Sequence, residues 1–430
     1  MPNSNGRALI CGGSRTPFVR AFAEYVEIDT IALAAMAVRG TLERSRVPWD
    51  AVDAVVWGGV ILPPTSPNVG RELVLDLKLP SRVEARTVTR ACASGLQAIT
   101  DAVAAVERGD ADVVIAGGSD STSNAPIPMP ESFIRKVGPV VMGRKSGFTD
   151  YLGLLARLSP TRDLLPRQPR VAERSTGELM GEAAESMAKR HQISREAQDA
   201  WTVRSHQRAE AAWTSGRFAD EVVPVKLPDG QVLARDTLVR ADTDMEKLAK
   251  LRPVFSKDGT LTAANSTALT DGAGAVIVAS ERAAERLGLT PLACLRSSAY
   301  IGVDPADQLL IGPALAMPRA LARAGLSLEE VDLVDLHEAF AAVVLVVRAV
   351  LENDAFARER LGMDRAPGHI ADEKLNVHGG SVALGHPFGA TGARMVLTMA
   401  NELHRTGKST ALLGICAAGG LGAAAVLGRV

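Results

Sequence analysis

Apolar residues in the first part of the chain recur at intervals of three and four positions, which is typical of one face of a helix. Leu96, Ile99, Val103 and Val106 follow this spacing, and the apolar run at 113–118 comes soon after them. A continuous apolar run of this length indicates a buried strand. The pattern therefore predicts a helix followed by a strand.

The same unit returns near the end of the chain. There a helix is indicated by four apolar residues: Val396, Leu397, Ala400 and Leu403. The run at 410–416 indicates the strand that follows. Gly95 aligns with Gly392 and Gly117 with Gly414, both at an offset of 297 positions. A constant offset predicts an internal duplication, although Ala-rich helices can also resemble one another through composition alone.

A second pair of segments supports the duplication. The stretch that ends in WDAVDAVVWGG resembles the one that ends in LEEVDLVDLHEAF, and Val52-Asp53 aligns with Val331-Asp332. Each half thus alternates helices with strands, which favours layered α/β sheets with helices packed on their faces. The expected fold class is α/β, with two duplicated halves.

Residues 125–252 interrupt this alternation. They contain the proline clusters PIPMPESF and RDLLPRQPR, which break regular structure, and a long helix over 194–216 that ends at a glycine. We interpret 125–252 as an inserted loop domain. The expected domains are an N-terminal half made of 1–124 and 253–290, this insertion, and a C-terminal half over 291–430.

The composition excludes several classes of function. Lys and Arg total 48 against 49 Asp and Glu, so no general positive field favours nucleic acid. No apolar run reaches the length of about 18 residues that a membrane-spanning helix needs. The first residues lack the features of a secretory signal, so a cytoplasmic location is expected. The four cysteines lie far apart without the spacing of a metal site, so no metal is expected.

Cys92 stands in RACASGLQAI, between a predicted strand and the first residues of a predicted helix. A helix N-terminus and a nearby imidazole can lower the pKa of a thiol from about 8.5 to the range of about 3.5 to 7.5, and the thiolate is the nucleophilic form. The position therefore favours a reactive cysteine. An inert buried cysteine beside small residues is the alternative.

Two histidines, His378 and His386, lie in the glycine-rich segment NVHGGSVALGHPFGATGAR. So many glycines indicate tight turns and a close approach of the backbone to another group. An imidazole with its ordinary pKa of about 6.5 is suited to take the proton of a thiol as a general base. One of the two histidines can serve instead to hold the loop by hydrogen bonds.

Two further segments end predicted strands with polar or reactive side chains. Cys416 closes a buried strand and is followed by glycines whose backbone N–H groups could face a developing oxyanion, although Gly-Gly also makes ordinary turns between strands. His337 and Glu338 follow the predicted strand VDLVDL, at the end where α/β sheets often bind ligands.

Six blocks in order along the chain together resemble the thiolases. They are CASGLQAI from Cys92, GGSDSTSNAP at 117–126, FSKDGTLTAANSTALTDGA at 255–273, HEAF at 337–340, GHPFGATGAR at 385–394, and the final cysteine-glycine turn. The resemblance covers essentially the whole chain. It implies the thiolase fold, with two similar α/β halves and a loop domain inserted in the first.

The resemblance also implies a reaction and a role for each site residue. Cys92 is the residue acylated, His386 deprotonates it, and Cys416 shuttles the proton of the departing or incoming acetyl group. His386 and His337, with a water between them, would form one oxyanion site, and the backbone N–H groups of Cys92 and Ala418 the other. The reaction implied is reversible, CoA-dependent retro-Claisen cleavage of 3-ketoacyl-CoA to acetyl-CoA and a shortened acyl-CoA.

At several positions the chain departs from the short-chain members of the family. It has His337 and His378 where they usually have Asn, Ala418 where they usually have Gly, and Leu179 where they often have His. The segments HEAFA, NVHGG and CAAGG, which contain His337, His378 and Ala418, look instead like the β subunits of fatty-acid oxidation trifunctional complexes and their bacterial relatives. We therefore favour β-oxidation of longer 3-ketoacyl-CoAs over a short-chain acetoacetyl-CoA thiolase.

Coenzyme A is expected as a substrate, with no permanently bound cofactor. No phosphate-loop signature occurs, and the resemblance assigns the CoA nucleotide to the loop domain. Met180, Thr267 and Phe340 are the predicted contacts to substrate or CoA. Family members are homodimers or homotetramers, and binding of a hydratase-dehydrogenase α subunit is left open.

Two other functions are weighed against this prediction. A ketoacyl synthase also uses a cysteine on a duplicated fold, but it uses two histidines and lacks a proton-shuttling cysteine, so Cys416 argues against it. A catalytically silent, thiolase-like lipid carrier or scaffold subunit would have no need of Cys92, His386 and Cys416 together.

Overall fold

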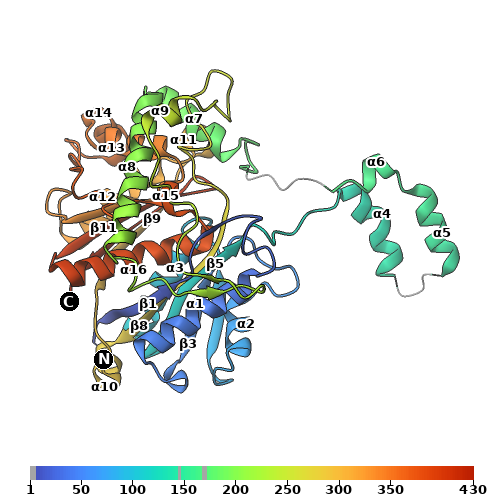
Figure 1. The fold of residues 1–430 in the computed structure, drawn as a ribbon, viewed down its shortest axis with the longest axis horizontal. Helices are drawn as coiled ribbons and strands as arrows, with labels where there is room; N and C mark the ends of the chain where they lie inside the picture. Colours follow the sequence, from blue (N-terminus) through green and yellow to red (C-terminus); the bar gives the residue numbers. More distant parts are fainter. Residues whose placement is uncertain (1–5, 144–146, 167–171) are drawn as a thin grey trace. The chain divides into compact units, whose positions relative to one another are not determined.

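The computed structural model describes residues 6–143, 147–166 and 172–430 (Figure 1). By its internal contacts the chain divides into two compact units. The first contains residues 1–124 and 173–430, and the second contains residues 125–172. None of the described helices combines the length and apolar character that crossing a membrane requires.

The first sheet of the larger unit has the strand order β1-β8-β5-β3-β4, and β2 pairs with β8. Strand β3 is parallel to both β4 and β5, whereas β8 is antiparallel to β5 and β1. The strands are β1 (Ala8–Arg15), β2 (Val19–Arg20), β3 (Ala54–Gly58), β4 (Glu84–Val88), β5 (Val113–Ser121) and β8 (Thr270–Ser280). All residues of β3, β5 and β8 are buried, as expected for strands covered on both faces.

The second sheet repeats the central part of the first. Its order is β10-β11-β12-β9, with β10 parallel to β11 and the other pairs antiparallel. Its strands are β9 (Cys294–Gly302), β10 (Leu333–Leu336), β11 (Thr410–Ala417) and β12 (Leu421–Gly428). Strands β3, β5, β8 and β1 thus correspond to β10, β11, β12 and β9. This topology confirms the duplication that the offset in the sequence predicted.

Helices α3 (Ser94–Arg108) and α16 (Phe388–Thr406) lie side by side between the two sheets (Figure 1). Their apolar side chains form one core with strands of both sheets. The two helices approach closely at glycines: a Cβ added to Gly95 would lie 2.3 Å from the carbonyl oxygen of Gly389. They are the two helices predicted at the duplicated positions, and each starts beside a predicted site residue.

Other helices cover the outer faces of the two sheets. On the first sheet these are α1 (Thr30–Ser45), α2 (Val69–Asp76) and α10 (Glu281–Leu287). On the second sheet this helix is α12 (Gly312–Ala324); α13 (Ala341–Leu351) packs on α12, and α7 (Met180–Arg190) and α8 (Arg195–Thr214) pack on α13. The predicted helix over 194–216 is confirmed as α8, with Ser194 accepting a hydrogen bond at its N-cap. The result is a layered α/β structure of the kind expected from the sequence.

Short elements complete the larger unit. They are η1 (Trp49–Ala51), β6 (Val225–Lys226), β7 (Val232–Leu233), α9 (Met245–Ala249), α11 (Pro305–Gln308), α14 (Asp354–Phe356), η2 (Ala357–Leu361) and α15 (Ser381–Leu384). Strands β6 and β7 pair with each other.

The smaller unit contains helices α4 (Glu131–Val141), α5 (Phe148–Arg157) and α6 (Pro160–Asp163). Residues 173–252 belong by their contacts to the larger unit, where α7 and α8 pack on α13. The division into domains at residues 124, 252 and 290 stays a prediction.

Candidate active site

Cys92 lies in the turn between β4 and α3, two residues before the helix begins. Ala91 has a φ of 45°, in the left-handed region that residues with a side chain rarely adopt. The hydroxyl of Ser94 holds this turn: it accepts a hydrogen bond from the Arg90 N–H at 2.7 Å and donates one to the Ala91 carbonyl at 2.6 Å. This geometry confirms the predicted position of Cys92 at the N-terminal end of a helix.

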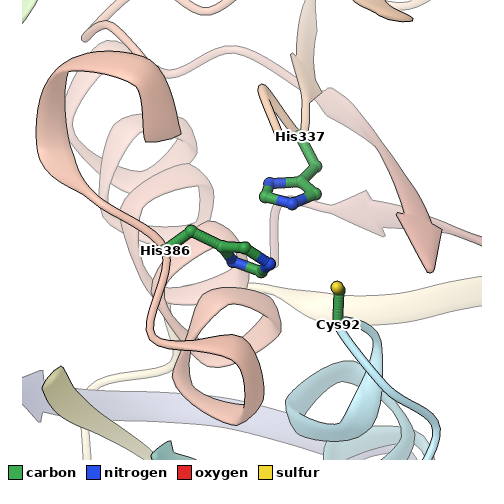
Figure 2. Close-up of side chains that lie close together, drawn as sticks. All are labelled: Cys92, His337 and His386. Atoms are coloured by element: carbon green, nitrogen blue, oxygen red, sulfur yellow. The ribbon is translucent and has the colours of Figure 1, made fainter. Parts of the chain in front are cut away.

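Cys92 faces two histidines that come from the other half of the chain (Figure 2). Its sulfur and one ring nitrogen from each of His337 and His386 all lie within 4.8 Å of one another. The two imidazole rings are 4.1 Å apart between centroids, with 51° between their planes. Three residues separated by up to 294 positions in sequence therefore converge on one point, and their catalytic roles stay a prediction from the resemblance to the thiolases. The same donor set is of a kind that can bind zinc, and the expectation of a metal-free site stays a prediction.

The electrostatic environment of Cys92 differs from the prediction. Burial raises the pKa of the thiol to about 12, although hydrogen bonds from the backbone N–H groups of Ala418 and of Cys92 itself act in the opposite direction. The expected lowering of this pKa by the helix N-terminus was therefore wrong for the resting site. A thiol with a raised pKa keeps its proton at neutral pH, so it needs a base at the moment of reaction.

The hydroxyl groups of two threonines hold His386, one through its backbone N–H and the other through its ring. Its N–H donates to Thr270 Oγ1 at 2.8 Å, and its Nδ1 lies 2.5 Å from Thr391 Oγ1. Its Nε2 is buried and has no hydrogen-bond partner among the described residues. Burial, together with the positive charge of Arg394, lowers the pKa of His386 to about 3. The imidazole is therefore neutral across the physiological range, rather than titrating near pH 7 as expected.

His337 follows directly after β10, at the carboxyl end of that strand, as predicted. Its Nδ1 lies 3.0 Å from Ser381 Oγ, and its Nε2 is buried with no hydrogen-bond partner among the described residues. Burial lowers the pKa of His337 well below its usual value, with smaller contributions from His386 and Arg394. Two neutral imidazoles therefore present a free nitrogen next to the thiol of Cys92.

Cys416 and Ala418 lie at the connection between β11 and β12. Cys416 is buried near the end of β11, and burial together with the nearby Cys92 raises its pKa. The backbone N–H of Ala418 acts to lower the pKa of the Cys92 thiol. The Gly419 N–H in the same turn donates to Glu173 Oε2 at 2.9 Å. The segment is a turn between antiparallel strands, and it also brings a second thiol and a backbone donor to Cys92.

His378 does not join this cluster. Its Nε2 lies 2.9 Å from Glu402 Oε2, and its ring packs edge-on against Phe218 at 6.2 Å between centroids. Of the two histidines in the glycine-rich segment, His378 is thus the one that holds the loop, and His386 is the one that faces Cys92.

The predicted contacts to substrate or CoA are Met180, Thr267 and Phe340. Met180 begins α7 and Phe340 precedes α13, and both belong to the apolar cluster on the outer side of the second sheet. The hydroxyl of Thr267 donates a hydrogen bond to the carbonyl oxygen of Ser381 at 2.8 Å. The role of these three residues in binding stays a prediction.

Four residues of the site were missed by the sequence analysis. Ser381, Thr391 and Arg394 surround the two histidines, and each lies inside the glycine-rich segment that was singled out for its histidines alone. Asp120 is the fourth: its buried carboxylate accepts hydrogen bonds from the N–H groups of Ile61 and Gly389, both at 2.6 Å. A hydroxyl or an arginine within a run of glycines and alanines was the signal that could have identified three of them.

Two family models match nearly the whole chain. The thiolase N-terminal domain matches residues 8–282, and the thiolase C-terminal domain matches residues 289–429. The chain belongs to the thiolase family. The boundary between the two matches lies near the boundary between the duplicated halves.

Relatives of known name agree with this assignment. The chain is 45% identical over 423 residues to the 3-ketoacyl-CoA thiolase of Escherichia coli O157:H7, covering 98% of this chain and 96% of the relative. It is 44% identical over the same length and coverage to the 3-ketoacyl-CoA thiolase of Yersinia enterocolitica. These identities extend over both thiolase halves.

Solved structures of thiolases share the fold. The human mitochondrial 3-ketoacyl-CoA thiolase in complex with CoA matches with a TM-score of 0.83 and 32% identity, covering 99% of this chain and 98% of the human one. The Bacillus anthracis acetyl-CoA acetyltransferase matches with a TM-score of 0.82 and 31% identity, covering 99% of both chains. The duplicated, layered α/β architecture of this chain is thus the thiolase fold.

Proposed function

We propose that this thiolase cleaves 3-ketoacyl-CoA with coenzyme A through an acyl group carried on Cys92. The observation that carries the proposal is the convergence of the Cys92 sulfur with a nitrogen of each of His337 and His386 within 4.8 Å. The names of the relatives from Escherichia coli and Yersinia, 3-ketoacyl-CoA thiolase, support the same reaction. The reaction runs in either direction, according to the concentrations of the thioesters.

In the first half of the reaction His386 takes the proton of the Cys92 thiol through its free Nε2. The sulfur forms a bond to carbon 3 of the substrate, and the bond between carbons 2 and 3 then breaks. The electron pair of that bond passes to carbon 2 as the enolate of acetyl-CoA, and the Cys416 thiol supplies the proton that completes acetyl-CoA. Burial opposes free charge at Cys92, which favours proton transfer during the attack over proton transfer before it.

In the second half the thiol of a new CoA molecule attacks the acyl group on Cys92. Cys416 takes the proton from CoA, and the bond between the acyl carbon and the Cys92 sulfur breaks. His386 returns its proton to Cys92 as the shortened acyl-CoA leaves. Every group is then restored to its starting state.

Two oxyanion sites follow from the donors near Cys92. The N–H groups of Ala418 and Cys92, which act to lower the pKa of the thiol, would stabilise the oxygen on carbon 3 while it carries negative charge. The ring nitrogens of His337 and His386, with a water between them, would bind the thioester oxygen, which becomes negative in the enolate. Preorganised donors of this kind usually contribute a factor of about 100 to 1,000 each to the rate.

Longer acyl chains and a role in β-oxidation are part of the proposal. Leu179, Met180 and Phe340 give apolar character to the neighbourhood where an acyl chain would lie. A homodimer or homotetramer, a hydratase-dehydrogenase α subunit as a partner, and a cytoplasmic location stay predictions. Coenzyme A enters the reaction as a substrate, in line with the CoA complex of the human thiolase.

The test compares CoA-dependent cleavage of acetoacetyl-CoA and of a long-chain 3-ketoacyl-CoA. Cys92→Ser and Cys416→Ser should each lose the activity, and Cys294→Ser is the matched control because Cys294 is buried on β9 outside the cluster. With CoA withheld, Cys92 should retain acyl label in the intact protein and in the control. Absence of cleavage of both substrates by the intact protein would contradict the proposed function and favour a lipid carrier or a scaffold subunit.

A further inference from the structure

A chain of buried polar groups leads from the second sheet to His337. The guanidinium of Arg394, on α16, donates from one nitrogen to Asp335 Oδ2 at 2.7 Å and from the other to Ser381 Oγ at 3.3 Å. Ser381 Oγ in turn lies 3.0 Å from His337 Nδ1. Asp335, Ser381, His337 and Arg394 are each at most 2% exposed. No bulk water therefore competes for these hydrogen bonds.

The direction of each hydrogen bond follows from what the groups can donate. A guanidinium has only donors, so Ser381 Oγ must accept the hydrogen bond from Arg394. The hydroxyl proton of Ser381 is then free for its other neighbour, and His337 Nδ1 is the acceptor within hydrogen-bond distance among the described residues. When Nδ1 of a neutral imidazole accepts, the ring proton is on Nε2. His337 therefore presents an N–H group toward Cys92.

The second imidazole has the opposite arrangement. The hydroxyl of Thr391 donates to the Pro387 carbonyl at 3.3 Å, as hydroxyls within helices often do. Thr391 Oγ1 can then only accept from His386, so His386 carries its proton on Nδ1 and donates it over 2.5 Å. Nε2 of His386 is left with a lone pair. Two rings 4.1 Å apart thus present different groups to the same thiol.

We propose that Ser381 and Arg394 are positioning residues that hold His337 in the tautomer with its proton on Nε2, which makes His337 a hydrogen-bond donor and leaves His386 as the base. The catalytic consequence rests on the proposed function, because the donor is needed for the enolate oxygen of acetyl-CoA. Without Ser381 the proton of His337 can move to Nδ1. Nε2 would then present a lone pair to the enolate and repel it.

The kinetic test removes the hydroxyl with His337 present and with His337→Asn. Ser381→Ala alone should lower kcat for thiolysis by about 10- to 100-fold with little change in KM, because a donor used in the transition state is lost. In the His337→Asn background the same substitution should cost less than about threefold, because an amide N–H has no tautomer to fix. Ser297→Ala is the matched control, since Ser297 is a half-buried serine on β9 that donates to the Ala320 carbonyl.

Equal losses from Ser381→Ala in both backgrounds would show a structural role and overturn the proposal, as would no loss in either. The tautomer itself is measured by nitrogen NMR of the histidine-labelled, substrate-free protein, with His337→Asn and His386→Asn to assign the signals. We expect the proton of His337 on Nε2 and that of His386 on Nδ1, and a mixture for His337 after Ser381→Ala. A proton on Nδ1 of His337 in the intact protein would overturn the proposal even if thiolysis is found. The expected tautomers in a protein without thiolysis would leave this assignment standing and remove the proposed function alone.

Discussion

Replacing Arg394 by methionine removes a buried charge while keeping a side chain of similar length. Arg394 holds Asp335 Oδ2 at 2.7 Å, and Asp335 Oδ1 has no hydrogen-bond partner among the described residues. Burial raises the pKa of Asp335 to about 6. The guanidinium of Arg394 partly opposes this rise, and the nearby Glu338 adds to it. In Arg394→Met the opposing charge is gone, so the pKa of Asp335 should rise further.

The sign and size of the effect follow from proton linkage. Because the pKa of Asp335 in the folded protein lies above its ordinary value of 3.8, the stability from this group is greatest below pH 3.8 and is lost as the pH rises through about 6. In Arg394→Met the carboxyl of Asp335 stays protonated to a higher pH. For each pH unit over which it does so, the folded protein loses about 1.4 kcal/mol of stability. The changed pKa of Asp335 should therefore destabilise Arg394→Met, relative to the intact protein, by close to zero at about pH 6. At about pH 8, two units higher, this destabilisation should reach up to about 3 kcal/mol.

The assay is urea unfolding of the intact protein and of Arg394→Met at both pH values, followed by tryptophan fluorescence. The double variant Asp335→Asn/Arg394→Met is the control, since it lacks both charges and its stability relative to the intact protein should change less between the two pH values. If the difference in stability between the intact protein and Arg394→Met is the same at both pH values, Asp335 is not the buried, ionised partner that the structure indicates, and the reasoning fails.

Three other predictions concern the site and the helices that carry it. Because burial raises the pKa of Cys92 to about 12, the intact protein and Cys92→Ser should show the same ultraviolet thiolate absorbance at neutral pH, and an excess in the intact protein would contradict the neutral thiol. Gly95→Ala places a Cβ 2.3 Å from a carbonyl oxygen of α16, so it should lower the thermal unfolding temperature by an amount corresponding to about 1–3 kcal/mol or more. Gly302→Ala is the control: no atom lies within 4 Å of the added Cβ, so the unfolding temperature should change little. Thr391→Val removes the acceptor for the Nδ1 proton of His386 and should lower kcat for thiolysis about 10- to 100-fold, whereas an unchanged kcat would show that this hydrogen bond does not orient the base.

Local patterns in the sequence were enough to predict the main helices and strands and to place the reactive residues along them. Helical spacing of apolar residues predicted α3 and α16, and the offset between them predicted the corresponding strands of two sheets. Cys92 before a helix and His337 after a strand were placed correctly because both features depend on neighbours in sequence. The convergence of these residues was inferred through the resemblance to the thiolases rather than from spacing.

Only the tertiary structure decided the chemical state of the site. It showed that His386 faces Cys92 while His378 pairs with Glu402, a distinction that the glycine-rich segment left open and only the resemblance to the thiolases implied. It also reversed the expected pKa of Cys92, since a helix N-terminus can be recognised in sequence but the loss of water around a thiol cannot. Burial and hydrogen-bond partners such as Ser381 depend on atoms brought together from distant parts of the chain, and these determine which groups hold a proton.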